Sequence, residues 1–176
     1  MVIGIDEVGR GPLAGPVVVA CVALPDDIDL KTSGLPLRDS KKLTEKQRTI
    51  WNIWIRKNPT IRFCIARSSP KTIDKINISK GANRAAYHAY KKVTNNSTSP
   101  ALLDAGIRLP KIIPQESIIK GDEKIPVISL ASILAKVSRD AYMERMHKRY
   151  PIYGFNKNKG YGTVRHIKAL KRHGPC

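Results

Sequence analysis

The sequence predicts one α/β domain, in which helices cover a mixed β-sheet. Three observations support this fold class. Short β-rich runs fill the first quarter of the chain, apolar residues recur at helical spacing further on, and strand and helix patterns then alternate. A length of 176 residues suits a single domain, which we place at 1–176. Hydrophobic residues make up 41% of the chain, which is enough to build a globular core.

The first half is predicted to begin with two paired strands, over 2–5 and 15–24, because glycines and Pro12 between them indicate a turn. The helical pattern further on is expected to restart near Asn77 or Ser79, since Gly81 weakens its middle. The elements expected after the paired strands are a loop over 25–38, a helix over 40–57, a strand over 60–67 and a helix over 73–93.

The second half contains the clearest helical pattern, which Pro126 opens. Its apolar residues recur at spacings of four, three and four from Leu130 to Ala141, while Ser132 and other polar residues fall on a different face. The remaining expected elements are short strands over 100–104 and 112–119, a loop over 150–162 and a last short helix capped by Thr163.

Positive charge is the strongest signal in the composition. The chain has 32 Lys and Arg against 14 Asp and Glu, which gives a net charge of +18. A nucleic acid is therefore the first candidate partner, and an acidic membrane surface the second. The segment 145–176 holds nine Lys and Arg and no acidic residue, so we expect it to contact the substrate.

Other function classes are excluded by residue usage. Three cysteines without zinc spacing argue against a disulfide scaffold or a zinc finger and favour a reducing, cytoplasmic location. The longest apolar run, 16–24, is too short to span a membrane.

Four acidic residues stand at the ends of predicted strands, next to glycines: Asp6, Glu7, Asp104 and Asp122. Carboxylates held together favour a hard cation such as Mg²⁺ or Mn²⁺, and two such ions can clamp the attacking and leaving oxygens of a phosphodiester. The alternative is that each acid only stabilises a turn. Adjacent strand residues also point to opposite faces, so Asp6 and Glu7 would need a bulge or turn to serve one site.

Six stretches resemble motifs of the bacterial ribonuclease HII family, in the family's order. The first reads GIDEVGRGPLAGP. The matching stretches are 4–16, 39–43, 103–104 with 120–122, 131–140, 159–163 and 173–176. The match spans the chain and is far more specific than a lone glycine motif.

The resemblance implies a ribonuclease H-like fold and an endonuclease. Its expected substrates are the RNA strand of RNA–DNA hybrids and duplex DNA with an embedded ribonucleotide, cut on the 5′ side to leave 3′-hydroxyl and 5′-phosphate ends. It also implies that the four acids form the catalytic metal site, with two Mg²⁺ or Mn²⁺ ions during catalysis and no small-molecule cofactor.

Substrate contacts are implied at two further stretches. Gly9, Arg10 and Gly11 would meet the 2′-hydroxyl largely through backbone groups, since glycines allow close approach and this hydroxyl distinguishes RNA from DNA. Tyr161 would stack or hydrogen-bond at the RNA–DNA junction, although an exposed aromatic without a role is the alternative. Candidate phosphate contacts, each with a solvated helix face as the alternative, are Lys41, Lys42, Lys136 and Arg139. Asp140 is left out of the metal site.

Departures from the family pattern are few. Asn158 stands where the family usually has His, and the chain ends at Cys176 where many relatives continue. The first strand follows directly on the start, without the N-terminal domain of ribonuclease HIII, which favours ribonuclease HII. Two alternatives remain open: a non-catalytic basic nucleic-acid-binding protein, and another two-metal nuclease of the same fold. We expect a monomer that does not bind membranes.

Overall fold

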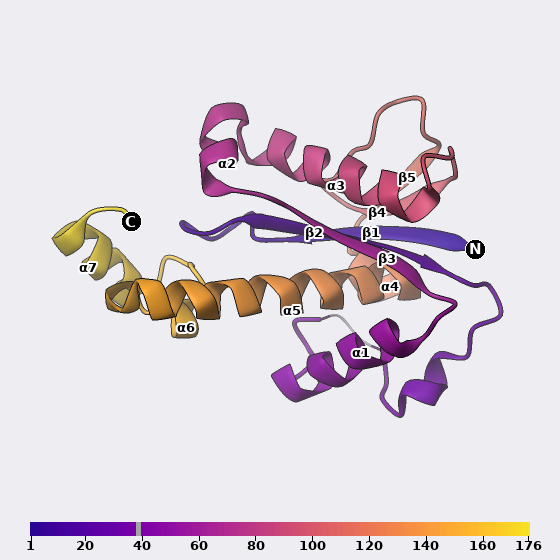
Figure 1. Cartoon of the computed structure of the whole chain (residues 1–176), viewed down its shortest axis with the longest axis horizontal. Helices are drawn as coiled ribbons and strands as arrows, with labels where there is room; N and C mark the ends of the chain where they lie inside the picture. The colour runs from indigo at the N-terminus through magenta and orange to yellow at the C-terminus, as the bar shows by residue number, and fades with distance from the viewer. Residues whose placement is uncertain (38–39) are drawn as a thin grey trace.

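The computed structural model describes residues 1–37 and 40–176, in which a five-stranded sheet lies between helices (Figure 1). The strand order is β3-β2-β1-β4-β5. Strand β1 pairs with β2 and β2 with β3 in antiparallel fashion, whereas β1 with β4 and β4 with β5 are parallel. This confirms the predicted mixed sheet. The strands are β1 (Val2–Val8), β2 (Val17–Leu24), β3 (Arg62–Ser68), β4 (Ala101–Asp104) and β5 (Gln115–Ile118).

Helices cover both faces of the sheet. Figure 1 shows α2 and α3 on one face and α1 and α5 on the other, with α7 at one end of the molecule. The helices and 3₁₀ turns are η1 (Leu30–Ser33), α1 (Glu45–Lys57), α2 (Pro70–Ile76), α3 (Ile78–Thr94), α4 (Gly121–Lys124), α5 (Pro126–Arg149), η2 (Pro151–Tyr153), α6 (Phe155–Asn158) and α7 (Val164–His173). None of the helices in the described part of the chain has both the length and the apolar character needed to cross a bilayer.

Strand β2 is the centre of the core, because all of its residues are buried. Its side chains alternate between two apolar clusters. Val19 and Cys21 pack toward α3, and Val18 and Ala20 pack toward α1 and α5. The sheet therefore buries both of its faces, which is why this strand reads as one continuous apolar run in the sequence.

Local capping explains where several helices begin. Thr44 and Gln47 form a reciprocal capping box, so α1 begins at Glu45, five residues later than the sequence predicts. Asn77, with φ of 69°, ends α2, and its side chain accepts a hydrogen bond from Lys80 N at the start of α3. The predicted restart at this point is confirmed, as is the cap formed by Thr163.

Two predicted loops contain short helical turns. The segment 150–162 holds η2 and α6, and the segment 25–37 holds η1. Each of these elements has four residues or fewer, so too few side chains contribute to a periodic pattern for the sequence to show one. Arg38, the last residue of the predicted loop 25–38, lies outside the described residues.

Helix α5 crosses β1 at very short range. A Cβ atom at Gly4 would lie 2.7 Å from the carbonyl carbon of Val127. Only glycine fits at this crossing, and the contact fixes the height of α5 above the strand that carries Asp6 and Glu7.

We expect Gly4→Ala to lower the free energy of unfolding by about 1–3 kcal/mol, because the new methyl group forces α5 away from β1. The matched control is Gly81→Ala, where the added Cβ would have its nearest neighbours at an ordinary 3.5 Å. This control lies inside α3 and should be neutral or stabilising by up to about 1 kcal/mol. Urea denaturation measures both, and equal effects of the two substitutions would contradict the assigned crossing.

A candidate carboxylate metal site

Strand β1 delivers two neighbouring carboxylates to one place without a bulge. Asp6 lies opposite Ala20 and Glu7 opposite Val19 in an unbroken register with β2, so the two side chains leave opposite faces of the sheet. The pairing of β1 with β4 ends at Ile5, one residue earlier. Beyond that point β1 pairs with β2 alone, and the side chains reach one another across the open edge on the β4 side. The expected need for a bulge or turn is therefore wrong.

Three of the four predicted carboxylates meet there. Ligand oxygens of Asp6, Glu7 and Asp104 all lie within 4.8 Å of one another. The backbone N–H of Glu7 donates to Asp6 Oδ1 at 2.7 Å, and the N–H of Gly121 donates to Asp104 Oδ1 at 2.7 Å. These bonds fix one oxygen of each aspartate and orient the carboxylates toward their shared space.

Burial makes this cluster electrostatically unfavourable. It raises the pKa of Asp6 well above its ordinary value, the charge of Glu7 adds to the shift, and a hydrogen bond from the Ser132 hydroxyl opposes it. Burial also raises the pKa of Glu7 to about 7, against the lowering effect of Arg10 and with a further rise from Asp104. Asp6 and Glu7 therefore resist being ionised at the same time unless a cation neutralises them.

The donor set fits a hard divalent cation. All three groups offer oxygen, the ligand type that Mg²⁺ and Mn²⁺ prefer. Glu7 Oε2 is buried and has no hydrogen-bond partner within the described residues. A buried carboxylate oxygen without a donor is costly, and a cation placed among the three groups would remove that cost.

Asp122, the fourth predicted ligand, lies beside this group of three and is not part of it. It is buried in α4, one residue after the glycine that bonds to Asp104. One carboxylate oxygen lies 3.4 Å from Lys41 Nζ. Its role as a metal ligand stays a prediction.

Two loops lie against one another beyond the end of β1 that carries Asp6 and Glu7. The loop 9–16 joins β1 to β2, and the segment 159–162 precedes α7. Gly160 O accepts hydrogen bonds from Leu13 N at 2.9 Å and Ala14 N at 3.3 Å. A Cβ at Gly11 would lie 3.7 Å from Tyr161 Cε1, so the half-exposed ring of Tyr161 lies beside the predicted 2′-hydroxyl contact.

The side chain of Arg10 is directed at the protein. Its guanidinium donates to Gly106 O at 2.8 Å and to Ser79 Oγ at 3.1 Å, and lies 3.5 Å from Glu7 Oε1. These contacts tie the loop to the neighbouring strand end and to α3. The expected contact of Gly9, Arg10 and Gly11 with a 2′-hydroxyl stays a prediction.

Arg139 requires a correction. The sequence places it among the phosphate contacts, yet its side chain is fully buried and its three nitrogens all donate to backbone carbonyls. A buried guanidinium with no donor directed outward does not reach a phosphate. The polar spacing along α5 suggested a solvent-facing residue, but the loops 9–16 and 159–162 cover this part of the helix.

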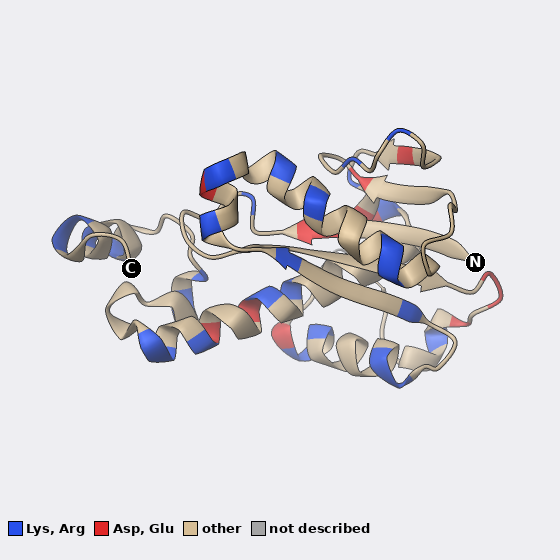
Figure 2. Cartoon of the chain, turned by 45° about the horizontal axis from the view of Figure 1, so that its top comes forward, with Lys and Arg blue, Asp and Glu red and all other residues tan. Residues whose placement is uncertain are grey.

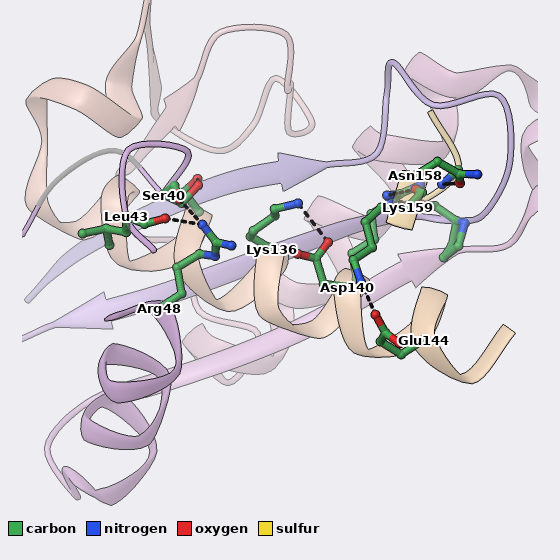
Figure 3. A network of polar contacts seen from close by, with 12 residues as sticks. Ser40, Leu43, Arg48, Lys136, Asp140, Glu144, Asn158 and Lys159 are labelled. Atoms are coloured by element: carbon green, nitrogen blue, oxygen red, sulfur yellow. Dashed lines mark hydrogen bonds and ion pairs between the residues drawn. The ribbon is translucent and has the colours of Figure 1, made fainter. Parts of the chain in front are cut away.

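The predicted lysine contacts are paired with acids. Lys136 Nζ lies 2.9 Å from Asp140 Oδ1, and both side chains are mostly covered (Figure 3). Lys42 pairs with Glu123 at 3.1 Å, and the Lys41 side chain is 78% exposed beside Asp122. All three lysines therefore stay candidates for phosphate contacts.

The segment that carries Lys41 and Lys42 is held from two sides. Arg48 donates to Ser40 O at 2.9 Å and also to the carbonyl of Leu43 (Figure 3). The Ser40 hydroxyl lies 2.8 Å from Ser132 Oγ, so the same segment is linked to the serine that bonds to Asp6. The first residue of this motif, Asp39, lies outside the described residues.

Sequence reasoning missed the part played by Ser132. The sequence pattern places Ser132 on the polar face of a helix, but serines are common on such faces and the pattern does not indicate which group the hydroxyl contacts. The fold brings it to Asp6 because α5 lies directly over β1. Lys and Arg are spread over α3, α5 and α7, as Figure 2 shows.

The strand order, the helices on both faces and the carboxylates at the strand ends define a protein with a ribonuclease H-like fold. Comparison with known proteins supports this class. A sequence profile described as Ribonuclease HII matches residues 3–176. The chain belongs to the ribonuclease HII family.

Curated relatives agree over nearly the whole chain. A ribonuclease HII of Bacillus cereus strain Q1 is 48% identical over 173 residues, which cover 97% of this chain and 64% of that protein. One from Hydrogenovibrio crunogenus is 46% identical over 174 residues, covering 98% of this chain and 80% of that protein. The chain thus spans less than two thirds of the length of its Bacillus relative.

Solved structures show the same architecture. Ribonuclease HII in the structure of the PCNA:RNase HII complex from Archaeoglobus fulgidus has a TM-score of 0.76 and 30% identity, covering 98% of this chain and 86% of that one. The ribonuclease H2 of Pyrococcus horikoshii has a TM-score of 0.77 at 23% identity, over 99% of this chain and 89% of that one, and it supports the fold.

The raised pKa of Glu7 predicts how the stability of the metal-free protein depends on pH. The folded chain holds a proton that the unfolded chain releases between about pH 4.5 and 7, so the free energy of unfolding falls as the pH rises through this interval. The contribution of Glu7 over the interval is about 3 kcal/mol.

Denaturation in chelator across this pH range, with wild type and Glu7→Gln, measures the effect. The variant cannot titrate at this position, so it should lose this part of the slope. The control is Glu116→Gln, which changes an exposed carboxylate on β5. An unchanged slope in Glu7→Gln would show that Glu7 does not carry a raised pKa.

Proposed function

We propose that this chain is a divalent-metal-dependent endonuclease. Its substrates would be the RNA strand of RNA–DNA hybrids and duplex DNA that contains a ribonucleotide, cut on the 5′ side. The observation that carries the proposal is the cluster of three carboxylates, one buried and two partly buried, near the Gly9–Gly11 loop and Tyr161 in a chain of the ribonuclease HII family. The expected biological role is removal of ribonucleotides from DNA.

The carboxylates Asp6, Glu7 and Asp104 would hold the cation, with Asp122 as the fourth ligand of the proposed quartet. Bound divalent cations supply an activated water at neutral pH and charge stabilisation for the leaving oxygen, with two ions proposed during catalysis. Hydrolysis of the phosphodiester would then leave a 3′-hydroxyl and a 5′-phosphate. Mg²⁺ and Mn²⁺ both suit the oxygen donors, which do not distinguish between them.

Substrate selection would come from the two loops beside the carboxylates. The backbone from Gly9 to Gly11 carries no bulky side chain at its ends, so a ribose can approach closely enough for a hydrogen bond to its 2′-hydroxyl. The half-exposed ring of Tyr161 offers a stacking surface next to that loop. Lys41, Lys42 and Lys136 would bind phosphates, and the basic segment 145–176 would extend the contact along the duplex.

A cleavage assay on three labelled duplexes tests the proposal: all DNA, DNA with one embedded ribonucleotide, and an RNA–DNA hybrid. We expect cutting of the last two only, dependent on Mg²⁺ or Mn²⁺ and absent in chelator. Binding to all three duplexes without cutting under any metal would instead identify a basic nucleic-acid-binding protein. Cutting of the all-DNA duplex would point to another nuclease of the same fold.

Asp104→Asn is expected to lower cleavage by more than about 100-fold, since even groups that only support metal ligands cost 10–100-fold. The asparagine keeps the oxygen that accepts the hydrogen bond from Gly121 N, so the fold should survive. Glu116→Gln removes an exposed carboxylate and should cut like wild type. Wild-type rates in a folded Asp104→Asn protein would refute the metal-site assignment.

A further inference from the structure

A buried guanidinium joins the two loops that would select the substrate. Arg139 Nε donates to Pro16 O at 3.0 Å, and one terminal nitrogen donates to Ala14 O at 3.0 Å. The other terminal nitrogen donates to Lys159 O at 2.8 Å. One side chain on α5 therefore binds both the end of the loop 9–16 and the start of the segment 159–162.

Burying a guanidinium lowers the stability of the fold unless it is compensated, which argues against an incidental contact. The side chain of Arg139 is fully buried, and a charged group out of water must be compensated by good hydrogen bonds. Its partners are neutral carbonyls, which accept from the planar fork of a guanidinium in a fixed arrangement. A hydrophobic residue would fill the same space without a buried charge, but it would remove the donors of three carbonyls, one buried and two partly buried.

Glycines allow the loop 9–16, the segment 159–162 and Arg139 to pack closely together. Gly9 has a φ of 110°, and a Cβ on it would lie 2.5 Å from Arg139 Nε. Gly160 has a φ of 88°, and a Cβ on it would lie 2.2 Å from Ala14 O. The two loops also bond directly, since Gly160 O accepts from Leu13 N at 2.9 Å. The loops cannot move independently without breaking one of these contacts.

The anchored atoms stand close in sequence to the groups that would touch the ribonucleotide. Lys159 precedes Tyr161 by two residues, and Gly9 packs on the guanidinium itself. A second link holds the same segment, because the Lys159 ammonium pairs with Glu144, which lies further along α5 (Figure 3). A change at position 139 would thus alter the distance between the 2′-hydroxyl contact and the stacking ring.

We propose that Arg139 is a positioning residue, which sets the spacing between the Gly9–Gly11 loop and Tyr161 and so adjusts the site to a ribonucleotide in a duplex. The inference rests on the proposed function. It assigns no contact between Arg139 and the substrate. Lysine at this position keeps the charge, but its donors all lie on one nitrogen in place of three directed ones, so it cannot reproduce the geometry that holds the three carbonyls.

A double-mutant cycle separates positioning from a general structural role. Arg139→Lys is expected to lower kcat/KM on the single-ribonucleotide duplex by about 10- to 100-fold, the cost of a small misplacement of binding groups. In a Tyr161→Ala background the same change should cost less than about threefold, because both substitutions disable one unit. The rise in melting temperature on adding Mn²⁺ should match wild type, since the carboxylates are untouched.

The control is Arg56→Lys, an exposed arginine at the end of α1, distant in the fold from both loops, which donates to Asn52 and lies over Phe63. Arg56→Lys should leave kcat/KM unchanged, both in the wild-type chain and in the Tyr161→Ala background. Effects of Arg139→Lys and Tyr161→Ala that multiply independently would overturn the inference, as would a folded Arg139→Lys protein with wild-type kcat/KM. A wild-type chain that cuts no ribonucleotide duplex would instead overturn the proposed function, and this inference with it.

Glu144→Gln provides a second route if Arg139→Lys does not fold. It removes the ion pair with Lys159 at an exposed position, so the fold should be retained. Loosening the same segment should raise KM by about two- to fivefold, in line with an exposed ion pair. That rise should vanish in the Tyr161→Ala background. An unchanged KM in Glu144→Gln would then count against the proposed spacing.

Discussion

The contact between α5 and β1 is the constraint on which the site depends. A side chain at Gly4 would collide with Val127, so the helix lies as close to the strand as the backbones allow. This closeness lets the Ser132 side chain reach Asp6. The same helix carries Arg139 beneath both loops. The crossing of α5 over β1 therefore fixes the positions of the carboxylates, their hydrogen-bond partners and the two loops relative to one another.

The carboxylate cluster works against stability in the absence of a cation. Burial and mutual repulsion raise the pKa values of Asp6 and Glu7, and Glu7 Oε2 lacks a donor within the described residues. The rest of the fold must compensate, and the fully buried β2 strand with its two apolar clusters supplies the compensation. Such local destabilisation is typical of functional sites, where groups are arranged to bind a ligand and lower the stability of the protein without it.

Much of the fold could be predicted, because apolar periodicity and capping residues act locally. The helix break at Asn77 and the cap at Thr163 are examples, since each side chain bonds to a backbone N–H within three residues. The site was harder, because its members come together only in three dimensions. The side chains of Asp6 and Glu7 leave opposite faces of one strand. They meet because the pairing of β1 with β4 ends at Ile5, and no local sequence pattern predicts where that pairing ends. Arg139 was misassigned because buried arginines are rare, and only the two covering loops reveal its burial.

The most direct test of this account is where a divalent cation binds. Crystals grown with Mn²⁺ would allow its anomalous scattering to be located. We predict a peak within coordination distance of the carboxylates of Asp6, Glu7 and Asp104, and its loss in Asp104→Asn crystals. Manganese bound elsewhere on the chain, with no peak among these three carboxylates, would contradict the assignment of the site.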